Sequence, residues 1–371
     1  MAESKAFKHW FDRAAARALA AQIQAADANF DKKRFVTAAS RGLDALEMMD
    51  RVKQFSAALR THLPQDIPEA LDTLTRSLPP PLPNCDAVTD GWLQWPVGQF
   101  IADYATDHYD AAMPAMYALT QRFSSEFAVR PFVERYPDQV FAQFAKWTDD
   151  ASPHVRRWCS EGVRPRLPWG ARLHALIEEP SPIFPILEAL KDDDELYVRR
   201  SVANTLNDIA KDHPDRVLSV LESWRDGATE GRDWVIKHAA RSLVKQGDAR
   251  ALALLGFAKP KSLDAQLTVA PKRIPIGGVV DLTLELTSRS RKAQPLMIDF
   301  VVHYPLANGQ SGPKVFKWTQ KEIAAGGRLT LSKTLRIKPT TTRVLRPGVH
   351  PVELQINGQR LAKASFRLIA S

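Results

Sequence analysis

Cysteine is scarce in this sequence, and long apolar runs are absent. The 371 residues contain two cysteines, Cys85 and Cys159, far apart and without a neighbouring His or Cys at ligand spacing. This pattern argues against a disulfide framework and against a zinc site. No segment approaches the roughly 18 consecutive apolar residues that indicate a membrane-spanning helix, and the first residues indicate an amphipathic helix instead of a secretory signal. We therefore expect a cytoplasmic protein with no membrane partner.

Motifs of several enzyme classes are also missing. The sequence contains no GxxxxGK[ST] phosphate loop, no HExxH pair and no GxSxG nucleophile turn. The histidines His154, His174, His213 and His238 are dispersed, which favours surface or capping positions over metal ligation. We expect no metal and no organic cofactor.

Acidic residues are few only in the last third of the chain. Residues 261–371 contain 18 Lys and Arg against 6 Asp and Glu, a net charge of +12, whereas residues 1–260 contain 33 against 36, a net −3. The whole-chain charge of +9 therefore belongs to the C-terminal part. A concentrated positive charge is typical of surfaces that contact nucleic acid.

The hydrophobic pattern changes at the same place. Up to about residue 258, apolar residues recur at helical spacing, as in PIFPILEALKD and RVLSVLESW. After GFAKPKSLD, apolar and polar residues alternate, as in VVDLTLELT and RLTLSKTLRI, between Gly-Gly, Asn-Gly and Pro turn signals. About seven short strands without an antibody-type cysteine pair indicate an immunoglobulin-like β-sandwich. We predict a helical domain over residues 1–258 and a basic immunoglobulin-like β-sandwich domain over residues 262–371.

The helical part repeats itself. DDASPHVRRWCSEGV at residues 149–163 aligns with DDELYVRRSVANTL at residues 193–206, and a third copy begins at Asp233. The aligned valines are Val155, Val198 and Val235, at offsets of 43 and 37 residues. Such offsets are typical of HEAT-like helix pairs, which bury their apolar sides only against neighbouring pairs. The predicted fold is therefore a HEAT-like α-solenoid with one concave surface, followed by the β-sandwich.

One helical face of these repeats carries charge. If the helix that contains Val155 continues through Arg164, then Arg157, Glu161 and Arg164 lie at positions i, i+4 and i+7 and share a face. We expect the acids of this face to be exposed on an inner wall lined by arginines. The corresponding face of the next two repeats carries Arg200, Asn204, Asp208, His238, Arg241 and Lys245.

Two plainer interpretations compete with this one. The Val-Arg-Arg segments could supply exposed charges and ion pairs to an Asp at a neighbouring turn, with Glu161 in a salt bridge worth under about 1 kcal/mol. Trp158, Trp169, Trp224 and Trp234 could all be packing residues of the repeats. Charge spacing alone leaves these alternatives open.

Three longer blocks carry a family resemblance. FSSEFAVRPF, WTDDASPHVRRWCSEGVRPRLPW and YVRRSVANTLNDIAKDHP resemble the AlkC branch of the HEAT-repeat alkylpurine DNA glycosylases, the relatives of AlkD. The resemblance covers about residues 1–258 and is most specific between residues 120 and 245. Some members of this branch carry an appended immunoglobulin-like domain, in agreement with the change of pattern after residue 260.

The resemblance implies base-excision repair of alkylated double-stranded DNA by a bacterial-type, nucleoid-associated monomer. The implied substrates are cationic N3-methylated bases, 3-methyladenine and 3-methylcytosine, which stay in the base stack without a base-flipping pocket. The family's catalytic acids correspond to Glu126, Glu161 and Asp208, and its aromatic residue at the lesion and sugar corresponds to Trp169. The side chains that we expect to bind DNA are Arg156, Arg157, Arg164, Arg199, Arg200, Arg241 and Lys245.

The chemistry gives such acids a purpose. Cleavage of the glycosidic bond of a cationic base moves positive charge onto the deoxyribose, in an oxocarbenium-like transition state. A fixed carboxylate stabilises this charge and orients or deprotonates the attacking water, and neighbouring arginines hold the carboxylate ionised. Because no lysine stands out as catalytic, we expect a monofunctional hydrolase that does not cut the strand.

The main alternative is a non-enzymatic HEAT-repeat scaffold that binds nucleic acid or an acidic protein through the same basic stripe. Such a scaffold predicts salt-sensitive binding without turnover. The basic sandwich is expected to clamp the duplex, with a role in solubility or partner binding as its own alternative. The sequence does not rank 3-methyladenine, 3-methylcytosine and 1-methyladenine as substrates.

Overall fold

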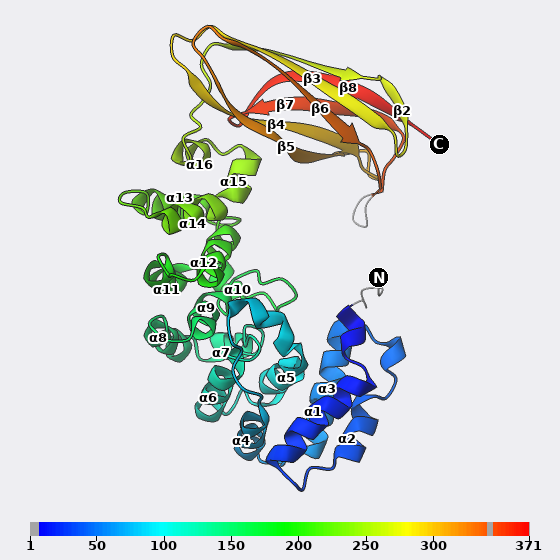
Figure 1. The fold of residues 1–371 in the computed structure, drawn as a ribbon, viewed down its shortest axis with the longest axis vertical. Coiled ribbons are helices and arrows are strands. Elements are labelled where there is room, and N and C mark those ends of the chain that lie inside the picture. Colours follow the sequence, from blue (N-terminus) through cyan, green and yellow to red (C-terminus); the bar gives the residue numbers. More distant parts are fainter. Residues whose placement is uncertain (1–6, 340–343, 371) are drawn as a thin grey trace. The chain divides into compact units, whose positions relative to one another are not determined.

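The computed structural model describes residues 7–339 and 344–370, and its contacts divide the chain into two units (Figure 1). The first unit contains the residues up to His213 together with Gly227–Ala239, and the second contains Pro214–Asp226 and the chain from Ala240 onward. Within the described ranges, sixteen α-helices precede eight strands. The predicted fold class, a helical region followed by an immunoglobulin-like sandwich, is confirmed.

The first unit consists of helices, with short 3₁₀ segments between some of them. The 3₁₀ segments are η1 (Phe7–Trp10), η2 (Leu43–Ala45), η3 (Cys85–Gln94) and η4 (Ser181–Ile183). The α-helices are α1 (Arg13–Ala26), α2 (Lys32–Ala39), α3 (Met48–His62), α4 (Ile67–Ser77), α5 (Trp95–Tyr104), α6 (Tyr109–Thr120), α7 (Arg130–Arg135), α8 (Pro137–Trp147), α9 (Pro153–Glu161), α10 (His174–Glu178), α11 (Phe184–Leu190), α12 (Leu196–Ile209) and α14 (Glu230–Ala239). No helix in the described part of the chain combines the length and the apolar character that crossing a bilayer requires.

Local sequence signals place many of the helix starts. Asp12, Asp31 and Asp66 cap α1, α2 and α4 by accepting hydrogen bonds from backbone amides of the first turn. Pro137 and Pro153 stand at the starts of α8 and α9, where the missing N–H group costs no helical hydrogen bond. These helices therefore begin at residues whose chemistry favours a helix start.

The helices of the sequence repeat pack against one another in order. α9 contacts α12, α12 contacts α14, and α11 contacts both α9 and α12. The three aligned valines, Val155, Val198 and Val235, are fully buried. Each one thus packs in the interior of the first unit, which is the role that an aligned apolar position in a repeat predicts.

The end of α9 differs from the expectation. The shared face of Arg157, Glu161 and Arg164 depended on a helix that continues through Arg164, but α9 ends at Glu161, and Gly162 follows as its C-terminal cap. Arg164 precedes Pro165, and the residue before a proline is disfavoured in helical conformation. Gly162 also lies so close to the α7 region that an added Cβ would come within 2.8 Å of Val129 Cγ1. The chain therefore leaves the helix before Arg164.

The second unit combines three helices with a two-layered β-sandwich. One sheet has the strand order β1-β3-β6 and the other β2-β8-β7-β4-β5. β2 pairs with β8 in parallel, and the remaining pairs are antiparallel. The helices are α13 (Pro214–Ser223), α15 (Arg241–Gln246) and α16 (Ala249–Leu254), and the strands are β1 (Leu263–Ala270), β2 (Arg273–Pro275), β3 (Val279–Ser288), β4 (Gln294–Pro305), β5 (Ser311–Ile323), β6 (Arg328–Arg336), β7 (Gly348–Ile356) and β8 (Gln359–Ile369).

The core of the sandwich follows the alternation of the sequence. Val280, Leu282, Leu284 and Leu286 of β3 are buried, with more exposed residues between them. Because side chains alternate between the two faces of a strand, this period of two directs one face inward. These leucines join residues of the second sheet, such as Phe300, in a single hydrophobic cluster.

A tight turn attaches the last helices to the sandwich within the second unit. The side-chain amide of Asn357, in the turn between β7 and β8, donates to the carbonyl of Ala258 at 2.7 Å and to that of Pro295 at 3.0 Å. A Cβ at Gly358 would lie 2.3 Å from the carbonyl oxygen of Gly247, the residue after α15. This close approach groups α15 and α16 with the strands, and the boundaries 1–258 and 262–371 stay a prediction.

Candidate active site

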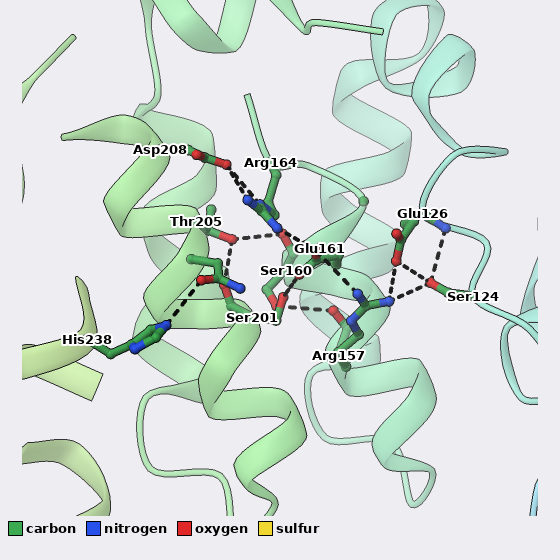
Figure 2. A network of polar contacts seen from close by, with 12 residues as sticks. Ser124, Glu126, Arg157, Ser160, Glu161, Arg164, Ser201, Thr205, Asp208 and His238 are labelled. Atoms are coloured by element: carbon green, nitrogen blue, oxygen red, sulfur yellow. Dashed lines mark hydrogen bonds and ion pairs between the residues drawn. The ribbon is translucent and has the colours of Figure 1, made fainter. Parts of the chain in front are cut away.

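The three acids that the sequence singles out belong to one network of polar contacts in the first unit (Figure 2). Glu126 precedes α7, Glu161 is the last residue of α9, and Asp208 lies in the last turn of α12. Arginines lie between the acids and join them in a row. We call this cluster the polar network; its charged members are Glu126, Arg157, Glu161, Arg164, Asp208 and Lys211, and its hydroxyl members are Ser124, Ser160 and Ser201.

Glu161 is held on both oxygens. Its Oε1 accepts from Nη1 of Arg164 at 2.6 Å and pairs with Nη2 of Arg157 at 3.3 Å. Its Oε2 accepts from the hydroxyl of Ser201, on α12, at 2.7 Å. Glu161 is 5 % exposed, so these contacts replace the water that its charge would otherwise bind.

Asp208 is held in the same way from the other side of Arg164. Its Oδ2 accepts from Nε of Arg164 and pairs with Nη2, both at 2.8 Å. Its Oδ1 accepts from Nζ of Lys211, one turn further along the chain, at 2.9 Å. Asp208 is 3 % exposed, and Arg164 thus bridges the carboxylates of two helical elements.

Glu126 lies at the more open end of the polar network. Its Oε2 accepts from the hydroxyl of Ser124 at 2.7 Å and forms an ion pair with Nη1 of Arg157. The Arg157 guanidinium lies 5.1 Å from the ring centroid of Tyr197, within the range of a cation–π contact. The side chain of Glu126 is 13 % exposed, more than twice that of Glu161. Glu126 is therefore the acid that an external ligand reaches most directly.

The charges of the polar network balance, because three carboxylates face three cations. Burial raises the pKa of Glu161, but Arg157, Arg164 and the hydrogen bond from Ser201 lower it by more, so the pKa lies below its ordinary value. Burial likewise lowers the pKa of Arg157, and Glu126 and Glu161 raise it by more. Glu161 and Arg157 are thus both ionised at neutral pH. Among the described residues, no group of His, Cys, Asp and Glu is arranged to hold a metal ion.

The expectation of exposed acids was wrong for Glu161 and Asp208. Both carboxylates are buried and paired with arginines or a lysine of the same unit. The physical reason is the contact between α9 and α12, which closes over the end of α9 and excludes water from the side chains there. A substrate therefore meets these two acids only through their cationic partners or after a rearrangement.

Trp169, unlike Glu161 and Asp208, is exposed to solvent. Its side chain is among the exposed large apolar ones, at 68 %, and its backbone has a φ of 64°. A left-handed conformation is costly for a bulky residue, and strained backbone of this kind clusters at functional sites. Its indole ring lies parallel to that of Trp95, with 6.3 Å between the ring centroids. Trp169 is thus displayed on the surface by the loop that follows α9.

A buried arginine holds this loop in place. Arg130, the first residue of α7, donates from Nε to the carbonyl of Ala171 at 2.6 Å. Its Nη1 donates to the carbonyls of Gly162 and Arg164, at 3.2 and 2.9 Å. Burial lowers the pKa of Arg130 to about 10, and it remains charged at neutral pH. One side chain thereby fixes both ends of the loop that carries Trp169.

The predicted DNA-binding arginines divide into several groups. Arg156 forms an ion pair with Asp193 at 2.6 Å, which is the contact between repeats that the plainer interpretation describes. Arg199 donates to the carbonyls of Asp193 and Asp194, and Arg200 is exposed. Arg157 and Arg164 belong to the polar network. Arg241 and Lys245 lie in α15, in the second unit.

A pocket with aromatic walls adjoins Glu126 and was not found from the sequence. Its volume is about 280 Å³, and its polar lining includes Ser124, Glu126 and Arg157. The tryptophans of the segment DGWLQWPVG were the available signal, but helical spacing alone suggests packing for them. We call this cavity the aromatic pocket; its ring-bearing walls include Trp10, Trp92, Trp95, Phe123, Trp169 and Tyr197.

Two supporting residues were also missed. Ser201 was aligned within the repeat without a role, and Arg130 was quoted only within a matching block.

Among the tryptophans, Trp158 and Trp224 are buried packing residues, with exposed fractions of 0 and 2 %. Residue type alone does not distinguish a buried tryptophan from an exposed one such as Trp169.

Comparisons with known proteins agree with one another. The family model described as DNA alkylation repair enzyme matches residues 117–243, which include the whole polar network. The model of the C-terminal Ig-like domain of the uncharacterised protein YhaZ matches residues 264–370. The chain is also similar to the uncharacterized protein YhaZ of Bacillus subtilis (strain 168), with 36 % identity over 342 residues, 92 % of this chain and 93 % of the relative.

A solved structure extends this similarity to the whole fold. The chain is similar to the Pseudomonas fluorescens alkylpurine DNA glycosylase AlkC, which was solved bound to DNA containing an abasic site analog. The TM-score is 0.90 and the identity 35 %, and the match covers 98 % of this chain and 100 % of the other. The similarity spans both units and confirms the resemblance carried by the three sequence blocks. This chain belongs to the AlkC family of alkylpurine DNA glycosylases, among the DNA alkylation repair enzymes.

Proposed function

We propose that this protein is a monofunctional DNA glycosylase that hydrolyses the N-glycosidic bond of cationic N3-alkylated bases, 3-methyladenine and 3-methylcytosine, in duplex DNA. The products are the free methylated base and an abasic site in an uncut strand. The observation that supports this proposal most is the row of three carboxylates and three cations beside the exposed Trp169. Family membership makes excision of alkylated bases the natural reaction for that row.

Glu126 is the acid that we assign to direct contact with the reacting nucleotide. It is the most exposed of the three and borders both the open aromatic pocket and Arg157. A DNA phosphate is a strong alternative partner for a guanidinium. A phosphate that approaches Arg157 competes with Glu126 for this charge and leaves the carboxylate free to face the sugar. Glu126 then stabilises positive charge at C1′ and orients the attacking water.

Glu161 and Asp208 act from inside the protein. Both carboxylates are buried, and electrostatic interactions weaken less with distance where water is excluded. Their negative charges hold Arg157 and Arg164 in position and favour positive charge on the sugar. A DNA phosphate that approaches neutralises part of the arginine charge. The negative charge of the carboxylates then exceeds the remaining positive charge, and this favours positive charge at the lesion.

Selectivity for cationic lesions follows from this arrangement. The glycosidic bond of an N3-methylated base is already weak, and the carboxylates stabilise the charge that moves to the sugar as the bond breaks. Trp169 offers its exposed ring to the deoxyribose, and bond cleavage proceeds with the lesion still in the duplex. Arg200 and the basic sandwich supply contacts with phosphates, which are independent of base sequence.

Release of free base from methylated duplex DNA tests the proposal. The wild type is expected to release 3-methyladenine and 3-methylcytosine, measured by chromatography, and Glu126→Gln to lose at least about a hundredfold in rate, the low end of what a positioned acid or base contributes. Glu178→Gln, an exposed acid at the end of α10, is the matched control and should retain the full rate. No release of either base by the wild type would contradict the proposal.

A non-enzymatic scaffold is the second candidate. The burial of Glu161 and Asp208 in ion pairs, and the ion pair between Arg156 and Asp193, favour it, because both are contacts that stabilise stacked helices. This candidate predicts duplex binding that weakens steeply with salt, equal affinity for methylated and unmethylated DNA, and no release of base.

A further inference from the structure

A groove between the second and third helices is separate from the candidate active site. α2 packs against α1 and α3 (Figure 1), and the groove between α2 and α3 has a volume of about 590 Å³. It shares no lining residue with the aromatic pocket or with the polar network. We call it the basic groove, because its lining includes Lys33, Arg34, Arg41 and His62.

Small residues leave the space between the two helices. Ala38 of α2 and Ala57 and Ala58 of α3 line the groove at places where longer side chains would fill it. The side-chain amide of Gln54, on α3, donates to the carbonyl of Ala38 at 2.8 Å. This bond satisfies a carbonyl near the end of α2 and joins the two helices beside the groove. The groove is thus set by side-chain size and by a specific contact.

The charge of this lining is positive. Among the described residues that line the groove, none is acidic. Arg34 has a carboxylate neighbour, with its Nε 3.4 Å from Oδ2 of Asp31. In the described part of the chain, no carboxylate forms an ion pair with Lys33 or Arg41. These two cations therefore keep their charge available for an anionic ligand.

The same cations are unfavourable for the helix that carries them. α2 begins with Lys32, Lys33 and Arg34, and no acid follows the capping Asp31 in the first turn. Positive side chains near the positive N-terminal end of a helix repel its dipole. Lys33 and Arg34 are exposed, so burial does not offset this repulsion. A bound anion would offset it, and binding should then raise the melting temperature.

The length of the groove favours a ligand with several charges. Lys33 lies in the first turn of α2 and Arg41 just beyond its end, and a helix of 8 residues is about 12 Å long. A single phosphate contacts one of these cations, whereas a linear chain of phosphates contacts both. The hydroxyls of Thr37 and Thr61 donate to carbonyls of their own helices. Recognition thus falls to the cations and depends on charge more than on shape.

We infer that the basic groove binds a linear chain of phosphate groups, either a free oligophosphate or the phosphodiester backbone of a nucleic-acid strand. Both present closely spaced anionic oxygens, which lysine and arginine bind through charge-assisted hydrogen bonds. Apart from His62, the described lining residues carry no ring that could stack on a base. Binding is therefore independent of base sequence. It is also independent of the proposed glycosylase reaction, because no residue of the polar network takes part.

Calorimetric titration of the full chain with inorganic tripolyphosphate at low salt tests the inference. We expect saturable binding, tighter than that of orthophosphate, together with a rise in the melting temperature. Lys33→Gln/Arg41→Gln should weaken tripolyphosphate binding by at least about tenfold, because one hydrogen bond to a charged group contributes roughly this factor. Arg13→Gln/Arg17→Gln removes two exposed cations of α1 outside the groove. This matched control should bind like the wild type, and cations of the sandwich are common to all three proteins.

A short unmethylated duplex distinguishes the two sources of phosphate. If the groove takes a nucleic-acid backbone, Lys33→Gln/Arg41→Gln will lower the slope of log affinity against log salt by up to about 2 relative to the control variant. If the groove takes a free oligophosphate, the duplex will bind both double variants equally, and tripolyphosphate alone will distinguish them. Thermal melts without ligand check that each variant is folded.

Three outcomes would overturn the inference. The first is equal binding of tripolyphosphate and of duplex by the two double variants. The second is orthophosphate binding as tight as that of tripolyphosphate, and the third is tighter binding of hexaglutamate, which would indicate an acidic peptide as the ligand. Failure of the wild type to release base from methylated DNA, with tripolyphosphate binding intact, would refute the proposed glycosylase and leave the groove inference standing.

Discussion

Each buried carboxylate of the polar network has at least two partners, and at the scale of single residues this pairing governs what the acid does. Arg164 joins Glu161 to Asp208, and Arg157 joins Glu161 to Glu126. Removal of one charge leaves the others unbalanced in a place that water does not reach. A substitution here therefore affects stability as well as chemistry, and the two effects are measured separately.

Glu161→Gln is expected to lower the free energy of unfolding by roughly 3 kcal/mol at neutral pH, because an unbalanced buried charge costs about this much. The pKa of Glu161 is lowered in the folded protein, so the wild type binds fewer protons at this site than the unfolded chain. Its advantage is complete above the ordinary pKa of about 4.5 and is lost as the pH falls through the folded-state pKa. Urea unfolding from about pH 3 to 7 measures both proteins, with Glu178→Gln as the control. Parallel pH curves for Glu161→Gln and wild type would contradict the pairing.

Trp169 offers a test of its strained backbone. Glycine tolerates the φ of 64° at this position and alanine does not, so Trp169→Gly should be more stable than Trp169→Ala by about 1 kcal/mol. At an ordinary helical position the order is the reverse. Both variants lose the ring, and both should lose base excision alike. Thermal melts provide the measurement, and a more stable alanine variant would count against the left-handed conformation.

At the scale of elements, the end of α9 is the junction on which the polar network depends. The helix stops at Glu161, the loop that follows carries Arg164 and Trp169, and Arg130 of α7 anchors this loop. The contact between Gly162 and Val129 sets how closely the two elements approach. A change in that spacing moves an acid, an arginine and the exposed tryptophan together.

Gly162→Ala should therefore destabilise the fold by about 1–3 kcal/mol through overpacking and reduce excision through displacement of Glu161 and Arg164. An added Cβ would lie 2.8 Å from Val129 Cγ1 and 3.1 Å from the carbonyl oxygen of Trp158. In a Val129→Ala background much of this space is available, so the additional cost of Gly162→Ala should shrink. Chemical unfolding of the four proteins measures the coupling between the sites. Strictly additive effects would show that the contact does not limit the helix end.

At the scale of the whole molecule, charge is divided between the two parts of the sequence. The last 111 residues carry a net +12, and the preceding 260 carry a net −3. Each phosphate that a cation neutralises releases counterions, so the salt dependence of DNA affinity counts such contacts. We therefore expect the cations of the sandwich to supply most of the non-specific attraction of this chain to DNA.

The exposed cations Arg291 and Lys292, in the loop between β3 and β4, are suited to this measurement. The variant Arg291→Gln/Lys292→Gln should lower the slope of log affinity against log salt by up to about 2, with excision chemistry at saturating DNA unchanged. Arg13→Gln/Arg17→Gln on α1 makes the same change in net charge. Equal slopes for the two double variants would show that net charge, and not the sandwich loop, determines the attraction.

Local information was sufficient for a large part of this structure. The order of helices and strands follows from hydrophobic periods of 3.6 and 2, and the starts of helices such as α9 from a capping residue or a proline. The shared face of Arg157, Glu161 and Arg164 required α9 to continue past Gly162, and the helix instead ends at Glu161. The family was identified correctly from three ordered blocks, because these keep the chemistry-bearing residues at fixed positions.

By itself, the sequence determined the family, the succession of helical and β parts, and the identities of the acids, arginines and tryptophan of the candidate site. Only the tertiary structure decided that Glu161 and Asp208 are buried, that Trp169 is exposed, and that distant aromatic residues enclose a pocket. The reason is physical: periodicity and motifs record neighbours along the chain, whereas exposure and ion pairing depend on which helices pack together. The contact of α9 with α12 converts a predicted charged surface into a buried row of ion pairs.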